Sequence, residues 1–152
     1  MIHIECFKSG LEHPLWEVHR SAVRLGCTND YTERQLKAWV PDEYKPDLWG
    51  NRIRGINPFV AFKGGVAVGY ADVQSNGYID HFFVHGKHQN EGVGSALMAK
   101  IFEESKNLDL LFSHVSVTAK SFFEKSGFVV IREQRVDIKG VELANYLMEY
   151  RK

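Results

Sequence analysis

The sequence has only two cysteines among its 152 residues, Cys6 and Cys27. Two thiols cannot form a framework of several disulfides, and they cannot supply the four ligands of a structural zinc site. We therefore expect them to stay reduced, as in a cytoplasmic protein. The four prolines are scattered, so no proline-rich linker divides the chain. The length then predicts one domain over residues 1–152.

Long apolar runs and an excess of charge of one sign are also missing. No apolar run approaches the roughly 18 residues of a membrane-spanning helix, and residues 1–7 alternate as a strand does, unlike a signal peptide. Nineteen Lys and Arg residues balance nineteen Asp and Glu residues, whereas proteins that bind a nucleic-acid backbone usually carry a basic excess. We expect a soluble cytoplasmic protein that binds neither nucleic acid nor a membrane.

Hydrophobic periodicity and turn residues predict an ordered series of helices and strands. Residues 41–57 are expected to be irregular or briefly helical. The helices are predicted over 11–25, 32–40, 93–106 and 119–126, and the strands over 1–7, 59–62, 66–71, 78–84, 110–117, 128–136 and 141–150. A helix that connects strands 78–84 and 110–117 makes these two strands parallel. The predicted fold class is therefore α/β (α+β), with a single mixed, mostly antiparallel twisted sheet flanked by helices.

The most informative segment is the loop and helix start at residues 84–97. Gly92 and Gly94 lie in the first turn of the predicted helix, where a glycine costs about 0.5–1 kcal/mol relative to alanine. Free N–H groups at a helix N-terminus attract an anion, and the missing side chains let phosphate oxygens approach. The segment therefore predicts a phosphate-binding loop. A glycine loop needed only for tight packing is the alternative.

Two well-known nucleotide-binding loops do not fit this segment. A P-loop requires a lysine after its last glycine, and here Ser95 and Ala96 follow Gly94. The dinucleotide-binding fingerprint requires a third glycine where Leu97 stands. The loop is thus expected to bind a different phosphate-containing ligand.

Residues 89–94 read Gln-Asn-Glu-Gly-Val-Gly, and residues 119–128 read Ala-Lys-Ser-Phe-Phe-Glu-Lys-Ser-Gly-Phe. The first resembles the Gln/Arg-x-x-Gly-x-Gly/Ala signature of the GNAT superfamily of acyl-CoA-dependent N-acetyltransferases. The second resembles the Ala-x-x-x-Tyr-x-x-x-Gly-Phe segment of the same family. The predicted order of elements is similar along the whole chain, while the specific motifs cover only residues 78–96 and 115–128.

The resemblance implies acetyl-CoA as co-substrate, with no metal. The main chain of strand residues 82–84 would bond the pantetheine arm as an added strand, and Phe123 would pack against it. The splayed gap between that strand and residues 111–117 would admit the thioester. The residues implied at the cofactor site are Phe82, Phe83, Val84, Gln89, Asn90, Glu91, Gly92, Val93, Gly94, Ser95 and Phe123, those from 89 to 95 binding the pyrophosphate through their N–H groups.

The implied reaction is attack of a primary amine, on a small molecule or a protein, directly on acetyl-CoA in a ternary complex. It needs a neutral amine, a donor for the oxyanion and a proton for the leaving thiolate. Phe123 stands where the family often has a tyrosine that protonates the thiolate. We expect water to take over, because a thiol pKa of about 8.5 makes thiolate a good leaving group.

The strand at residues 78–84 supplies the candidates for the general base. Alternation along a strand places Tyr78, Asp80 and Phe82 on one face, and His81 on the other. Asp80 is the first candidate, since Tyr78, at the position matching the family's acid, has an ordinary pKa of about 10 and is a poor base. Asp80 could equally tie down a neighbouring backbone or arginine. A bulge would exchange the faces and favour His81.

Alternatives remain open for the metal, the function and the partners. His81 and His85 would lie about 13 Å apart at 3.3 Å per residue, too far to hold one ion, so no metal site is predicted. The phenylalanine at position 123 favours a second function, a non-catalytic acyl-CoA sensor. Residues 28–54, where the family builds its acceptor site, carry as many acidic as basic side chains and do not define the acceptor. A homodimer stays open.

Overall fold

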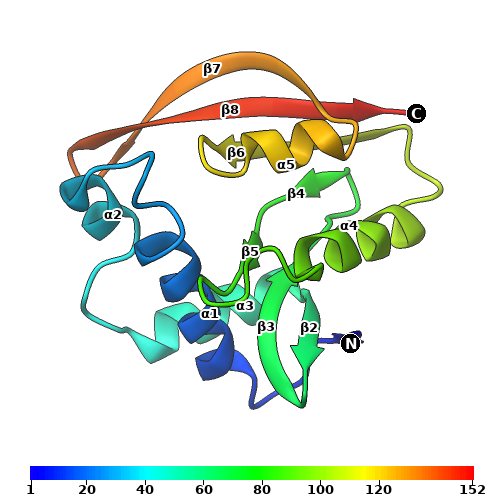
Figure 1. The fold of residues 1–152 in the computed structure, drawn as a ribbon, viewed down its shortest axis with the longest axis horizontal. Helices are drawn as coiled ribbons and strands as arrows, with labels where there is room; N and C mark the ends of the chain where they lie inside the picture. Colours follow the sequence, from blue (N-terminus) through cyan, green and yellow to red (C-terminus); the bar gives the residue numbers. More distant parts are fainter.

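The computed structural model describes residues 1–152, and Figure 1 shows its ribbon. The elements occur close to the predicted ranges, apart from a longer helix than expected within residues 41–57 and one divided strand. The helices are α1 (Glu12–Arg24), α2 (Glu33–Trp39), α3 (Pro46–Ile56), α4 (Val93–Glu104) and α5 (Lys120–Lys125). The strands are β1 (Ile2–Cys6), β2 (Phe59–Lys63), β3 (Val66–Ala71), β4 (Tyr78–Ile79), β5 (Phe82–Val84), β6 (Leu110–Ser116), β7 (Val129–Ile138) and β8 (Val141–Arg151).

The strands form two four-stranded ladders. The first has the order β1-β2-β3-β5 and is antiparallel throughout. The second has the order β4-β6-β8-β7, in which only β4 and β6 are parallel. This mixed, mostly antiparallel architecture flanked by helices confirms the predicted fold class. The strand predicted over 78–84 is interrupted, however, and each half pairs in a different ladder.

The start of α2 follows its local sequence, whereas α3 is longer than the brief helix that was expected. Thr32 Oγ1 accepts the N–H of Gln35 at 3.2 Å, and Gln35 Oε1 accepts the N–H of Thr32 at 2.8 Å, which is a complete capping box. In α3, Pro46 occupies the first turn and Asn57 ends the helix in a left-handed conformation. The prediction of an irregular or briefly helical segment over residues 41–57 was right only in part: α3 is 11 residues long, and two glycines within it obscured the helical spacing of its buried Trp49 and Ile53.

The core consists of two clusters of buried apolar side chains that share β2 and β3. The first cluster lies under α1, α2 and α3 and includes Val60 and Tyr70. The second lies under α4 and α5 and includes Ala61 and Val68. Because neighbouring residues of one strand point to opposite faces, the same two strands supply both clusters.

The strand β7 forms an edge of the second ladder and runs along the top of the molecule in Figure 1. Its first residues are apolar and exposed: Val129 is 60% exposed, Val130 37% and Ile131 47%. The register with β8 shifts between Val130 and Arg132, so that Ile131 is an extra residue on the edge strand.

Candidate functional site

The chain changes its strand partner at Asp80 and His81. Tyr78 and Ile79 pair with Phe112 and Ser113 of β6, and the Ser113 hydroxyl donates to the Ile79 carbonyl at 2.7 Å. The next strand, β5, pairs with β3 and has no strand on its other edge. Since β5 and β6 belong to different ladders, the sheet is split between them. This is the place where a splayed gap was predicted.

The alternation of side chains predicted for residues 78–84 does not hold across this break. Ile79 packs in the same cluster as Phe82, although alternation would place them on opposite faces. Asp80 contacts Arg52 of α3, and the ring centroid of His81 lies 6.2 Å from that of Trp49 in the same helix. The prediction that Asp80 and His81 face opposite sides was therefore wrong, because the two residues between β4 and β5 do not have strand conformation.

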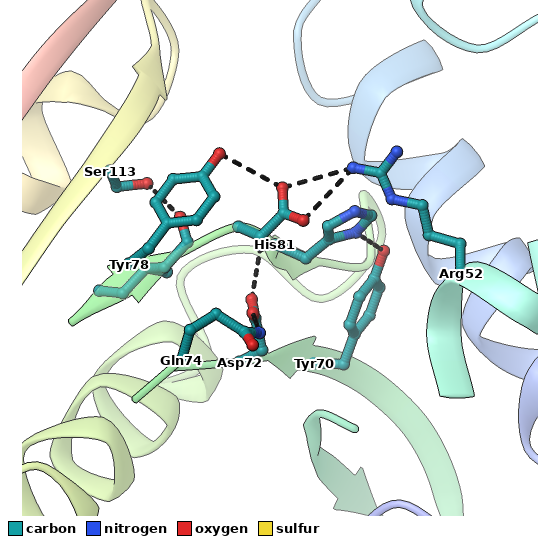
Figure 2. A network of polar contacts seen from close by, with 9 residues as sticks. Arg52, Tyr70, Asp72, Gln74, Tyr78, His81 and Ser113 are labelled. Atoms are coloured by element: carbon teal, nitrogen blue, oxygen red, sulfur yellow. Dashed lines mark hydrogen bonds and ion pairs between the residues drawn. The ribbon is translucent and has the colours of Figure 1, made fainter. Parts of the chain in front are cut away.

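Asp80 lies at the centre of a polar group that faces α3. Arg52 Nη2 lies 3.3 Å and 3.4 Å from the two carboxylate oxygens, and the Tyr78 hydroxyl donates to Oδ1 at 3.4 Å (Figure 2). Burial, followed by the charge of Asp80, raises the pKa of Tyr78, so its hydroxyl keeps its proton at neutral pH. The Asp80 side chain is 24% exposed, which leaves its carboxylate within reach of a ligand.

His81 is buried among aromatic rings. The Tyr70 hydroxyl and His81 Nδ1 are 2.9 Å apart, and the His19 ring centroid lies 5.7 Å away. Burial, followed by the positive charge of Arg52, lowers the pKa of His81 to about 3. The ring is therefore neutral at physiological pH and its Nδ1 can accept the Tyr70 hydroxyl. His19 Nδ1 is buried and has no hydrogen-bond partner.

One acidic residue at the break was not found by sequence reasoning. Asp72 follows β3, is 1% exposed and accepts the backbone N–H of His81 on Oδ1 at 2.6 Å. Gln74 Nε2 donates to its other oxygen, as Figure 2 shows. Burial raises the pKa of Asp72 to about 6. The only sequence signal is an acidic residue directly after a buried apolar strand, and no motif includes it.

The predicted phosphate-binding loop has the backbone conformation that the glycines suggested. Gly92 is the N-cap of α4 with φ of 86°, and Asn90 has φ of 61°. The first backbone hydrogen bond of the helix runs from the Ala96 N–H to the Gly92 carbonyl. None of the backbone N–H groups from Gln89 to Ser95 donates a hydrogen bond within the protein. They surround the positive end of the α4 dipole, which is an arrangement that binds anions.

The side chains of this loop fix it to the rest of the protein. Gln89 Nε2 donates to the Val84 carbonyl at 2.9 Å, and the Ser21 hydroxyl accepts the N–H of Gly86 at 2.9 Å. Glu91 pairs with His88 at 3.1 Å and also with Lys63. The side chains of Gln89 and Glu91 are thus occupied by bonds within the protein, while the main-chain N–H groups are free.

The edge of β5 that faces the split also has free polar groups. The Asp72 N–H donates to the His81 carbonyl, and the His85 N–H donates to the Val68 carbonyl. These two bonds show which residues of β5 direct their backbone polar groups towards β3. Alternation then directs the N–H groups of Phe82 and Val84 to the open edge. The polar groups of Phe83, between them, face β3.

Phe123 lies beside this edge without a polar group. It is 2% exposed, and its ring centroid is 5.4 Å from that of Phe82. Gly94 lies on the same side, since a Cβ there would meet the Phe122 ring at 3.2 Å. A Cβ at Gly92, in contrast, would meet no atom within 4 Å. Glycine is favoured there because the backbone has a positive φ. The structure is therefore compatible with both explanations of the two glycines, anion access and close packing.

The residues do not form a metal site of ordinary composition. No group of three or more His, Cys, Asp and Glu side chains is placed so that it could hold a metal ion. Among the helices, none combines the length and the apolar character that crossing a membrane requires.

A split sheet, with an open strand edge beside a helix start rich in free N–H groups, is an arrangement suited to an elongated ligand that carries anionic groups. Comparison with known families is consistent with such a ligand. The model of the family described as acetyltransferase (GNAT) domain matches residues 27–150. The chain therefore belongs to the GNAT acetyltransferase family, which confirms the resemblance found in the sequence.

Relatives of known name cover almost the whole chain. An uncharacterized N-acetyltransferase, YafP of Escherichia coli (strain K12), is 29% identical over 150 residues, 99% of this chain and 96% of that protein. A GCN5-related N-acetyltransferase from Rhodopseudomonas palustris has a crystal structure with a TM-score of 0.92 at 24% identity, covering 99% of this chain and 95% of that chain. The PaiA N-acetyltransferase from Thermoplasma acidophilum, crystallised with coenzyme A, has a TM-score of 0.72 at 18% identity, covering 100% and 99%. The two structures show that the fold is shared.

Proposed function

We propose that this protein transfers an acetyl group from acetyl-CoA to a primary amine of a small molecule or a protein, by direct attack in a ternary complex. The observation that carries the proposal is the row of free N–H groups from Gln89 to Ser95 beside the open edge of β5. Membership of the GNAT acetyltransferase family supports it. The crystal structure of the PaiA relative with coenzyme A supports the choice of cofactor.

The residues present fit two parts of acetyl-CoA, its pyrophosphate and its pantetheine arm. The N–H groups of residues 89–95 bind the pyrophosphate at the start of α4. The N–H groups of Phe82 and Val84 bond the pantetheine arm, which adds to β5 as a strand. Phe123 forms an apolar wall beside Phe82. Acetyl-CoA supplies the activated acyl group, and no metal takes part.

Asp80 is the general base of the proposed reaction. Its carboxylate takes a proton from the attacking amine, directly or through a water, as the C–N bond forms and the C–S bond of the thioester breaks. Tyr78 orients the carboxylate through its hydroxyl. Phe123 has no proton to donate, so water protonates the departing thiolate. The products are an acetylated amine and coenzyme A with a free thiol.

His81, the other candidate base, is less suited to this role. Whereas the Asp80 side chain is 24% exposed, the His81 ring is buried and is less accessible to an amine. Its Nδ1 is also occupied by the Tyr70 hydroxyl. We infer that the His81 ring contributes to the wall of the acceptor side.

The test is to incubate the protein with acetyl-CoA and a panel of primary amines while the free thiol of coenzyme A is measured. We expect thiol release that saturates with the concentration of one class of amine, together with the acetylated product. Saturable acetyl-CoA binding without thiol release for any amine would contradict the proposal and support the sensor function, which the missing hydroxyl at Phe123 favours. The cytoplasmic location and a homodimer remain predictions.

A further inference from the structure

The ladder between β3 and β5 ends in an unusual way. Asp72 and His81 follow its last registered pair, Ala71 with Phe82. In a regular antiparallel ladder, such residues exchange two backbone N–H to carbonyl bonds. The Asp72 N–H does donate to the His81 carbonyl at 3.1 Å. The His81 N–H, however, donates to the side-chain carboxylate of Asp72 at 2.6 Å. A carboxylate therefore replaces a backbone carbonyl.

This replacement lets the chain leave one ladder for the other without losing a hydrogen bond. Just before the break, the Ser113 hydroxyl fixes the Ile79 carbonyl to β6 at 2.7 Å. Just after it, the Asp72 carboxylate fixes His81 to the end of β3. The chain is thus held to two different strands within three residues of each other. The break between the two ladders therefore has a side-chain hydrogen bond on each side.

The position is an unfavourable one for an acidic side chain. Asp72 is 1% exposed, and burying a charge is costly unless hydrogen bonds compensate for it. Both oxygens do have donors, the His81 N–H and Gln74 Nε2. Even so, burial raises the pKa of Asp72 to about 6. A buried apolar residue here would avoid that penalty but would leave the His81 N–H without an acceptor.

We propose that Asp72 is a positioning residue of the acetyl-CoA site: by accepting the His81 N–H, its carboxylate holds β5 apart from β6 so that the thioester can enter between them. This role rests on the proposed function, because it assumes that acetyl-CoA occupies the split. Without the acceptor, the His81 N–H is unpaired in a buried place, and β5 no longer has a fixed angle to β6.

The first experiment is calorimetric titration with acetyl-CoA at pH 7.5. We expect Asp72→Ala to weaken the affinity at least tenfold. Asp72→Asn should remain within threefold of the wild type, because its amide oxygen still accepts the His81 N–H and Gln74 can rotate its own amide to match. Leu36→Ala, in a buried position on α2, is the control for a general loss of stability and should bind acetyl-CoA normally.

The second experiment does not depend on acetyl-CoA. The titratable groups around Asp72 are Asp80, Tyr70, Tyr78 and His81. Both tyrosines have a raised pKa, and the pKa of His81 is about 3. The two tyrosines and His81 therefore do not titrate between pH 5 and 7. We expect the backbone amide proton of His81 in NMR spectra to shift with pH about a midpoint near 6 in the wild type. Asp72→Asn should remove this step.

The outcomes separate the two proposals. Failure of the wild type to bind acetyl-CoA would reject the proposed function, while the His81 amide would still report on its bond to Asp72. A folded Asp72→Ala protein that binds acetyl-CoA as tightly as the wild type would overturn the positioning role. If that variant does not fold, Asp72→Ser, whose shorter side chain cannot reach the His81 N–H, takes its place. A His81 amide whose chemical shift has the same pH dependence in the wild type and in Asp72→Asn over pH 3 to 8 would equally overturn it.

Discussion

Asp80 has two partners, and they suggest different roles for its carboxylate. The contact with Arg52, at 3.3 Å, is what a purely structural ion pair between α3 and the strand break would show. The contact with the Tyr78 hydroxyl and the partial exposure of the side chain suit a general base. The two roles differ in what the removal of Arg52 does, which makes them separable by mutation.

We expect Asp80→Asn to lower the turnover number by about 10²–10⁴, the usual contribution of general base catalysis, with acetyl-CoA affinity within threefold of the wild type. The measurement is steady-state thiol release combined with calorimetric titration. Arg52→Gln is the matched control, since it removes the ion pair but keeps the carboxylate, and it should change turnover far less. Equal losses in the two variants would show that Asp80 only holds Arg52.

Asp72 links folding stability to pH in a direction opposite to that of most acidic residues. Its pKa in the folded protein is about 6, above the ordinary 3.8, so the folded state binds the proton more tightly than the unfolded state. The contribution of Asp72 to the free energy of unfolding therefore rises as the pH falls from 7 towards 4. At neutral pH its ionised form costs at most about 3 kcal/mol, at about 1.4 kcal/mol per pKa unit.

Asp72→Asn should accordingly make the protein more stable at pH 7.5, by at most about 3 kcal/mol. The difference from the wild type should vanish as the pH approaches 4, where the folded wild type is also uncharged at this position. Urea unfolding of both proteins at pH 7.5 and pH 4 measures this difference. A constant difference at the two pH values would show that Asp72 does not titrate as described.

At the scale of single elements, the loop before α4 depends on backbone conformation more than on side chains. Gly92 has a φ of 86°, and a Cβ at this position would meet no atom within 4 Å, so a larger residue would be strained without clashing. Such strain amounts to about 1–3 kcal/mol, and relieving it would turn the neighbouring N–H groups away from their common direction.

We expect Gly92→Val to lower acetyl-CoA affinity at least tenfold while the protein remains folded. Gly140→Val is the control: Gly140 also has a positive φ, 80°, with open space around it, but lies in the turn between β7 and β8. The Gly140→Val protein should lose a similar free energy of unfolding and keep its affinity for acetyl-CoA. Calorimetric titration and thermal unfolding provide the two measurements. Unchanged affinity in Gly92→Val would exclude this loop as the pyrophosphate site.

The elements with strong local signals could be predicted from the sequence. The capping box of Thr32, the glycine turn at 64–65 and the glycines of the loop before α4 act within a few residues, so their effect is visible in a short segment. The helix α3 could not be predicted in the same way, since its buried Trp49 and Ile53 gain stability from packing against distant elements.

The polar contacts at the break could not be predicted for a related reason. Asp72 reaches His81 across a turn and a strand, Arg52 reaches Asp80 from α3, and Ser113 reaches Ile79 from β6. Each contact requires the sheet to divide where it does. Sequence reasoning pointed only to Asp80 and His81 among these residues, because only the three-dimensional arrangement brings their partners close to them.

At the scale of the whole molecule, the two core clusters are expected to unfold together. They share β2 and β3, whose opposite faces enter different clusters. Trp16 and Trp49 lie in the first cluster, so tryptophan fluorescence reports on that side, while far-UV circular dichroism reports on the whole chain. We expect the urea transitions from both probes to coincide, as for a single domain over residues 1–152. Transitions with separate midpoints would show two independently unfolding units.

The edge of β7 has a consequence for the behaviour of the protein at high concentration. Exposed apolar residues on an unpaired strand edge can recruit a strand from another molecule and start aggregation. The extra residue Ile131 interrupts the regular spacing of hydrogen-bonding groups beside Val129 and Val130, because a bulge bends the strand and increases its twist. An incoming strand therefore cannot pair in register along this apolar stretch, and the irregularity protects the molecule against uncontrolled polymerisation.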